Sequence, residues 1–130
     1  MKSIVSGAQV VPISELKEFP NNPRRGDVEL LMESLSYHGQ YRPIVANRRT
    51  KEVLAGWHTL VAARKLGWDK ITVTWVDVDP LTAKRIVLAD NRLSDLANYD
   101  DTALLDLMMV LKDLEGTGFN NDDLANHGLS

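Results

Sequence analysis

Apolar residues follow two different periods along this chain, and each period predicts one kind of element. Between residues 71 and 78 apolar and polar residues alternate, which predicts a strand with its odd-numbered side chains, Asp77 included, on one face. From Val28 to His38 the apolar residues instead recur at helical spacing, and Gly39 follows as a C-terminal cap. The change of period predicts a mixture of strands and helices.

A short apolar strand, one glycine and a helix follow one another in the middle of the chain. Val53 to Ala55 form the strand and Gly56 the turn, and Gly67 closes the helix that follows. Because glycine places no side chain over the first helical turn, the free backbone N–H groups there can point at an anion such as phosphate. A tight connection without a ligand fits the same pattern, and the glycine by itself leaves both interpretations open.

The remaining elements are mixed at first and purely helical towards the end. Before the central turn we expect an edge strand at 10–13, a helical turn at 14–17, a loop at 19–27 with a helix cap at Gly26 or Asp27, and a hairpin of strands 43–47 and 51–55. After it we expect a helix from Pro80, capped by Asp79, to Asn91 or Leu96, a helix at 101–114 ended near Gly116, and a short helix at 119–125 capped by Asn121. This order indicates an α+β domain with a helical tail.

The composition narrows the class of protein without naming one. The 130 residues suffice for one domain with a core, and the net charge of −3 with a pI near 5.5 argues against a free-standing binder of duplex DNA. The absence of cysteine excludes disulfides, thiolate zinc sites and a cysteine nucleophile, and fits a reducing cytoplasm. No apolar run reaches membrane-spanning length and no signal-peptide pattern opens the chain, so we expect a cytoplasmic protein without a membrane partner.

Several stretches stand in an order that is typical of one family. They are Val11-Pro-Ile-Ser-Glu-Leu16, Asn22-Pro-Arg24, Leu31 to Gly39, Arg42-Pro-Ile-Val45, Leu54-Ala-Gly-Trp-His-Thr-Leu-Val-Ala-Ala63, Leu66-Gly67 and Leu88-Ala-Asp-Asn-Arg-Leu93. Together they resemble the ParB/sulfiredoxin domain, also called the ParB-like nuclease domain, over residues 10–96. The segment from Asn98 to Leu124 resembles the tail of stand-alone members found in phage and near DNA methyltransferases.

The resemblance implies a fold and a division of the chain. The fold is a small α+β domain, in which a small mixed sheet packs against helices and the nucleotide site lies where a strand–turn–helix meets a later helix. We therefore expect a flexible N-terminus at 1–9, a ParB/sulfiredoxin-like domain at 10–96, and a helical C-terminal extension at 97–130 packed on the same domain.

The resemblance also implies a set of site residues. In chromosome-segregation members a Gly-Glu-Arg-Arg turn holds the phosphates of CTP, and a later Glu-Asn with a following Arg supports the metal and the phosphates. By position, the nucleotide-binding residues here are Gly56, Trp57, His58, Thr59, Arg24 and Arg92, and the ligands of Mg²⁺ are Asp90 and Asn91. The turn departs from the family pattern because two arginines are replaced, which removes strong contacts to phosphate and weakens the expectation of tight CTP binding.

The two arginines each have a structural alternative: Arg24 could close the site from the early loop or only brace that loop, and Arg92 could reach a phosphate or be a solvated side chain.

Five other residues of this set also have a purely structural interpretation. His58 could donate to phosphate or bond a nearby carbonyl, and Thr59 could contact phosphate or cap its helix. Trp57 could stack on a base or pack against the sheet, and Asp90 and Asn91 could bind Mg²⁺ or mark the end of a helix. The stripe of leucines and methionines between 104 and 114 fits a core or a partner-helix face, and part of it fits a dimer contact.

Three functions are consistent with the resemblance and with the replaced arginines. The first is a nucleotide-binding domain that binds CTP or ATP with Mg²⁺, hydrolyses it slowly to switch states, and reaches DNA weakly or through a protein partner or homodimer. The second is a metal-dependent DNA nuclease, and the third a degenerate module that binds a protein. Sulfiredoxin chemistry is excluded because Trp57 occupies the position of the required cysteine.

Overall fold

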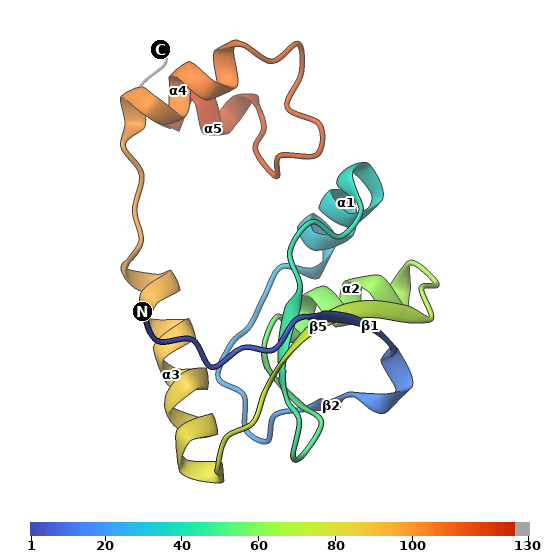
Figure 1. The fold of residues 1–130 in the computed structure, drawn as a ribbon. Coiled ribbons are helices and arrows are strands. Elements are labelled where there is room, and N and C mark those ends of the chain that lie inside the picture. Colours follow the sequence, from blue (N-terminus) through green and yellow to red (C-terminus); the bar gives the residue numbers. More distant parts are fainter. Residues whose placement is uncertain (127–130) are drawn as a thin grey trace.

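The computed structural model describes the backbone of residues 1–126 and the side chains of residues 1–123. The strands are β1 (Ala8–Pro12), β2 (Lys17–Glu18), β3 (Ile44–Asn47), β4 (Glu52–Ala55) and β5 (Lys70–Val76), with a short 3-10 helix η1 at Ile13–Glu15. The helices are α1 (Val28–His38), α2 (Trp57–Lys65), α3 (Pro80–Leu96), α4 (Asp101–Met109) and α5 (Asn121–Asn126). Figure 1 shows these elements along the chain.

The strands form one mixed five-stranded sheet in the order β1-β5-β3-β4-β2. β1 pairs with β5 and β3 with β4 in antiparallel fashion, whereas β3–β5 and β2–β4 are parallel pairs. The sheet is small and mixed, and helices pack on it, so the predicted α+β class is confirmed.

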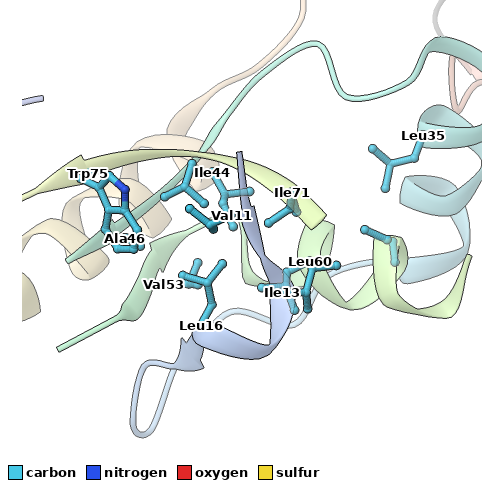
Figure 2. Close-up of a cluster of buried hydrophobic side chains, with 13 residues drawn as sticks. Val11, Ile13, Leu16, Leu35, Ile44, Ala46, Val53, Leu60, Ile71 and Trp75 are labelled. Carbon is cyan, nitrogen blue, oxygen red and sulfur yellow. The ribbon is translucent and has the colours of Figure 1, made fainter. Parts of the chain in front are cut away.

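Two clusters of buried side chains fix helices to the sheet. The larger one joins the strands to α1 and α2 and includes Leu35, Val53 and Leu60 (Figure 2). The smaller one joins the sheet to α3 through Leu54 and its neighbours. Because successive side chains of a strand point to opposite faces, the consecutive residues Val53 and Leu54 anchor helices on the two faces of β4. The site at the end of β4 is thereby held from both sides.

Helix α1 and the two strands of the hairpin lie within one residue of their predicted bounds, but β1 begins at Ala8, inside the predicted N-terminus 1–9, and the strand β2 was not predicted. Asp27 caps α1 by accepting from the N–H of Leu30, and the hairpin of β3 and β4 and the glycine before α2 are observed. The alternation in β5 stops earlier than predicted, because the strand ends at Val76 and Asp77 is exposed and paired with Arg49.

The tail departs most from the prediction. Helix α4 ends at Met109 instead of continuing to residue 114, and the chain then turns through two glycines with positive φ, Gly116 and Gly118. The cap of α5 is also one residue earlier than predicted. The Oδ1 atom of Asn120 accepts from the N–H of Asp123, and Asn121 is the first helical residue.

Helix α3 starts at the predicted cap and runs to its longer predicted limit. The carboxylate of Asp79 accepts from the backbone N–H of Thr82, and this hydrogen bond lowers the pKa of Asp79. The stability that this hydrogen bond contributes is therefore present above the unfolded-state pKa of Asp79. It is lost as the pH falls through the lower folded-state pKa. Since α3 continues to Leu96, Asp90 and Asn91 lie inside the helix, and their interpretation as helix-end residues is wrong.

The tail contacts α1 through both backbone groups of one glycine. The Gly116 N–H donates to Oε1 of Glu33 (2.9 Å), and Nε2 of His38 donates to the Gly116 carbonyl (2.8 Å). In Figure 1, α4 and α5 lie away from the sheet, and the irregular segment 97–100 connects them to α3. Among the described residues, no helix is both long and apolar enough to cross a bilayer.

Gly116→Ala is expected to loosen the tail. A Cβ there would lie 2.6 Å from Cγ and Cδ1 of Tyr37, whereas at Gly118, which has the same φ of +78°, the nearest atom is 4.0 Å away. Gly118→Ala therefore shares the backbone strain without the clash, and Gly116→Ala should cost about 1–3 kcal/mol more. Hydrogen exchange of the α4 amides measures the effect, and equal exchange in the two variants would contradict the contact.

Candidate functional site

The turn before α2 requires glycine for two separate reasons. Gly56 has φ +95°, a left-handed conformation that side chains disfavour, and a Cβ there would lie only 2.6 Å from Cγ2 of Ile44. No side chain caps α2 at this end. Because the first N–H groups of a helix lack partners within the helix, they remain available to an anion above the turn.

A cavity of about 330 Å³ lies at this turn. Five parts of the chain line it: the loop before α1, α1 itself, the segment between α1 and β3, the segment from β4 into α2, and α3. Its lining residues are Asn22, Arg24, Gly26, Leu31, Arg42, Leu54, Ala55, Gly56, Trp57, His58, Thr59, Asp90, Asn91 and Ser94. A second cavity of about 360 Å³ shares residues of the turn and of α3 with it. Both cavities therefore border the start of α2.

The structure brings seven of the eight residues predicted from the sequence to this cavity. These are Gly56, Trp57, His58, Thr59, Arg24, Asp90 and Asn91. The eighth, Arg92, is exposed and lines none of the described cavities. Arg92 lies two positions after Asp90 on the same helix. Residues two apart on a helix do not share a face, whereas residues four apart do, so Arg92 is directed away from the cavity side.

Sequence reasoning missed three polar residues of the cavity: Asn22, Arg42 and Ser94. Ser94 could have been found, because it follows Asp90 by four positions on the same helix. Asn22 and Arg42 lie in loops, where no periodicity indicates which way a side chain points.

Arg24 joins the loop before α1 to the far wall of the cavity. Its Nε donates to Oδ1 of Asn91 (2.7 Å), its Nη2 donates to the Asn91 carbonyl (3.2 Å), and its Nη1 lies 3.6 Å from the carboxylate of Asp95. The Asn91 amide also donates to the Val87 carbonyl (2.9 Å), so both ends of this side chain are bonded. Arg24 thus holds α3 against the loop, and the predicted metal-ligand oxygen of Asn91 accepts from Arg24.

His58 and Thr59 stand on the first turn of α2 and both line the cavity. Gly26 makes room for the imidazole, since a Cβ at Gly26 would lie 2.8 Å from Cγ of His58. Within the part of the chain that the structure describes, the His58 side chain makes no hydrogen bond, so the carbonyl-bonded interpretation is not observed. Thr59 does not cap α2, whose N-cap is Gly56.

Trp57 lines the cavity and also packs. Its side chain is half-buried against the larger core cluster, and the guanidinium carbon of Arg64 lies over the indole, 5.8 Å from the ring centroid. The packing alternative for this residue is therefore observed.

The oxygen ligands of this cavity suit magnesium only in company with a phosphate. Asp90 is the single carboxylate that lines it, and among the described residues no three His, Asp or Glu side chains gather into a metal site. Magnesium commonly takes one or two carboxylates together with substrate phosphates and water. The cavity can therefore accommodate Mg²⁺ beside Asp90 when a phosphate chain supplies the other ligands.

Comparison with known proteins gives one family and several similar folds. The model of the ParB N-terminal domain family matches residues 2–92. The C-terminally truncated chromosome-partitioning protein ParB from Caulobacter crescentus, complexed with CTP-gamma-S, is similar with a TM-score of 0.73 at 21% identity, over 94% of this chain and 77% of that chain. No curated protein matches the sequence.

Two further structures share the fold at lower similarity. The same Caulobacter protein complexed to the centromeric parS site gives a TM-score of 0.53 at 21% identity, over 92% of this chain and 69% of that chain. Sulfiredoxin from Arabidopsis thaliana gives 0.52 at 21% identity, over 63% of this chain and 98% of that chain. The fold is thus of the ParB/sulfiredoxin type. Since the family model covers well over half of its length, this chain belongs to the ParB N-terminal domain family.

Arg24→Met is expected to free the C-terminal half of α3. It removes three contacts to Asn91 and Asp95, whereas Arg25→Met removes a charge from the same loop but only contacts within that loop. Loss of charge-assisted hydrogen bonds should speed amide exchange in residues 91–96 by about tenfold. Hydrogen exchange measures this, and an equal change in the Arg25 variant would show that Arg24 does not hold α3.

Gly26→Ala is expected to displace His58 and to lower the free energy of unfolding by about 1–3 kcal/mol. The physical reason is the 2.8 Å approach of the added Cβ to the imidazole. Gly7→Ala is the control, because nothing lies within 4 Å of a Cβ there. Urea unfolding compares the two variants, and a Gly26 variant as stable as the control would contradict the close packing.

Proposed function

We propose that this protein is a nucleotide-binding ParB-like domain that binds a nucleoside triphosphate, CTP or ATP, together with Mg²⁺. One observation carries the proposal. The uncapped start of α2, with His58 and Thr59 on its first turn, lines the same cavity as the carboxylate of Asp90 on α3. The similarity of the fold to a ParB solved with CTP-gamma-S supports it.

The start of α2 and the facing side of α3 bind different parts of the ligand. The N–H groups at Gly56 to Thr59 and the side chains of His58 and Thr59 bind phosphate oxygens, helped by the positive end of the helix dipole. Asp90 holds Mg²⁺, which neutralises charge on the phosphate chain. Arg24 keeps α3 in place through Asn91 and therefore acts as a positioning residue.

Other parts of the ligand follow from position in the cavity. Trp57 lines the cavity and is only partly buried against the core, so the remaining part of its indole is available to the base or the ribose. Arg92 has no role in the proposal, because it lies outside the cavity.

A role in a DNA-associated process is part of the same proposal. A ParB of similar fold was solved complexed to its centromeric parS site. The net charge of −3 makes strong direct binding to duplex DNA unfavourable, so we propose that any contact with DNA is weak or is made through a partner. Since Asp90 is the single carboxylate of the cavity, no observation favours the nuclease alternative.

Titration of CTP, ATP and GTP with and without Mg²⁺ tests the proposal. A ligand at 100 times its Kd should stabilise the folded protein by about 2.7 kcal/mol, which a melting curve detects. Phosphate release in the same samples measures hydrolysis, and nicking of plasmid DNA measures nuclease activity. If no triphosphate shifts the melting temperature at millimolar concentration, the proposal is wrong and the protein-interaction module takes its place.

Asp90→Asn is expected to remove the Mg²⁺-dependent part of binding. The variant keeps the shape of the side chain but loses the charge, so affinity with Mg²⁺ should fall by about tenfold, towards the metal-free value. Asp106→Asn is the matched control, since Asp106 is exposed on α4 and outside the cavity. Isothermal titration of all three proteins makes the comparison, and Mg²⁺ dependence that survives in the Asp90 variant would place the metal elsewhere.

A further inference from the structure

Arg42 lies where three cavities meet. It lines the main cavity of about 330 Å³, the second of about 360 Å³, and a small one of about 70 Å³ next to α1. Thr59, on the first turn of α2, lines the same three cavities. The side chain of Arg42 therefore stands beside the uncapped helix start from which the phosphate contacts were proposed.

The guanidinium of Arg42 makes no hydrogen bond or ion pair with the residues that the structure describes. Arg24, the other arginine of the main cavity, is bonded to α3 through Asn91 and Asp95. The charge of Arg24 is thus already compensated within the protein. Arg42 is the cavity arginine whose donors are available to a ligand.

The backbone that carries Arg42 is fixed although its charged end is not. The Arg42 carbonyl accepts from Nε2 of Gln40 (3.2 Å), and the Gln40 amide also pairs with both backbone groups of Thr72 in β5, at 2.8 and 2.9 Å. Pro43 follows directly and restricts the chain further. A free arginine on an anchored backbone loses little backbone freedom on binding.

The chemistry of this side chain indicates the ligand group. A guanidinium presents a planar fork of donors that matches two oxygens of one phosphate, and such charge-assisted contacts are stronger than neutral ones. Since the first turn of α2 already favours an anion, the two features are complementary and address the same group.

We infer that Arg42 binds the phosphate chain of the nucleoside triphosphate and is the main phosphate-binding side-chain cation of this site. The inference rests on the proposed function, because it assigns one more contact in the proposed nucleotide site. It adds a residue that lies outside the turn and outside α3, on the segment between α1 and β3.

Isothermal titration of the triphosphate that the wild type binds best tests the inference. Arg42→Gln should weaken binding by about 10- to 100-fold, the loss typical of one charge-assisted contact. Arg42→Lys should recover part of the loss, since it restores the charge without the planar fork. Arg85→Gln is the control, because Arg85 is exposed on α3 and lines no described cavity, and it should bind like the wild type.

A second ligand distinguishes phosphate binding from a structural effect. The factor lost on Arg42→Gln should be smaller for the matching nucleoside monophosphate, which offers fewer phosphate oxygens, while the melting temperature of the free variant stays at that of the wild type. A wild type that binds no triphosphate would overturn the proposed function and this inference together. A wild type that binds while Arg42→Gln binds equally well would overturn the inference alone.

Discussion

The close approach of backbone and side chain at Gly56 is the constraint on which the site depends. The chain leaves β4 with φ +95° and passes so near Ile44 that a single methyl group would meet Cγ2 at 2.6 Å. Only a residue without a side chain meets both conditions, and the helix that follows is left without a cap. The close packing under the turn thus requires Gly56, and because Gly56 has no side chain it cannot cap α2. The same residue therefore belongs to the core and leaves the start of the helix open.

The opposite wall of the cavity is held by polar contacts and not by a core. The N-terminal half of α3 is anchored by Ala83 and Val87 in the smaller cluster, but beyond residue 87 its side chains are largely exposed. The C-terminal half of α3 is positioned by Arg24, which lies in a loop and is 67 residues away in sequence from its partner on the helix. Such a wall is weaker than the packed wall at Gly56, because charge-assisted contacts that are only partly buried are screened by water. The site therefore combines one rigid side with one adjustable side.

Features set by local chemistry could be predicted, and features set by distant contacts could not. The glycine before α2 and the Asp79–Pro80 start of α3 are encoded within a few residues, and both were found. The end of α4 was placed too late, because leucines continue the helical pattern while the docking of Gly116 on α1 turns the chain. Arg42 was assigned no binding role, because only the fold brings that loop beside Thr59.

The contacts at Gly116 close a circuit through the molecule. From the loop of Arg24 the chain enters α1, which bonds to Gly116 in the tail. The tail leads back through residues 97–100 to α3, and α3 bonds to Arg24 again. The C-terminal half of α3 is therefore one member of a closed ring of linked segments, since Arg24 bonds to Asn91 and Asp95 and the chain leaves the helix at Leu96. This ring opens only when the Arg24 contacts to α3 or the Gly116 contacts to α1 break, because every other link in it is the covalent backbone.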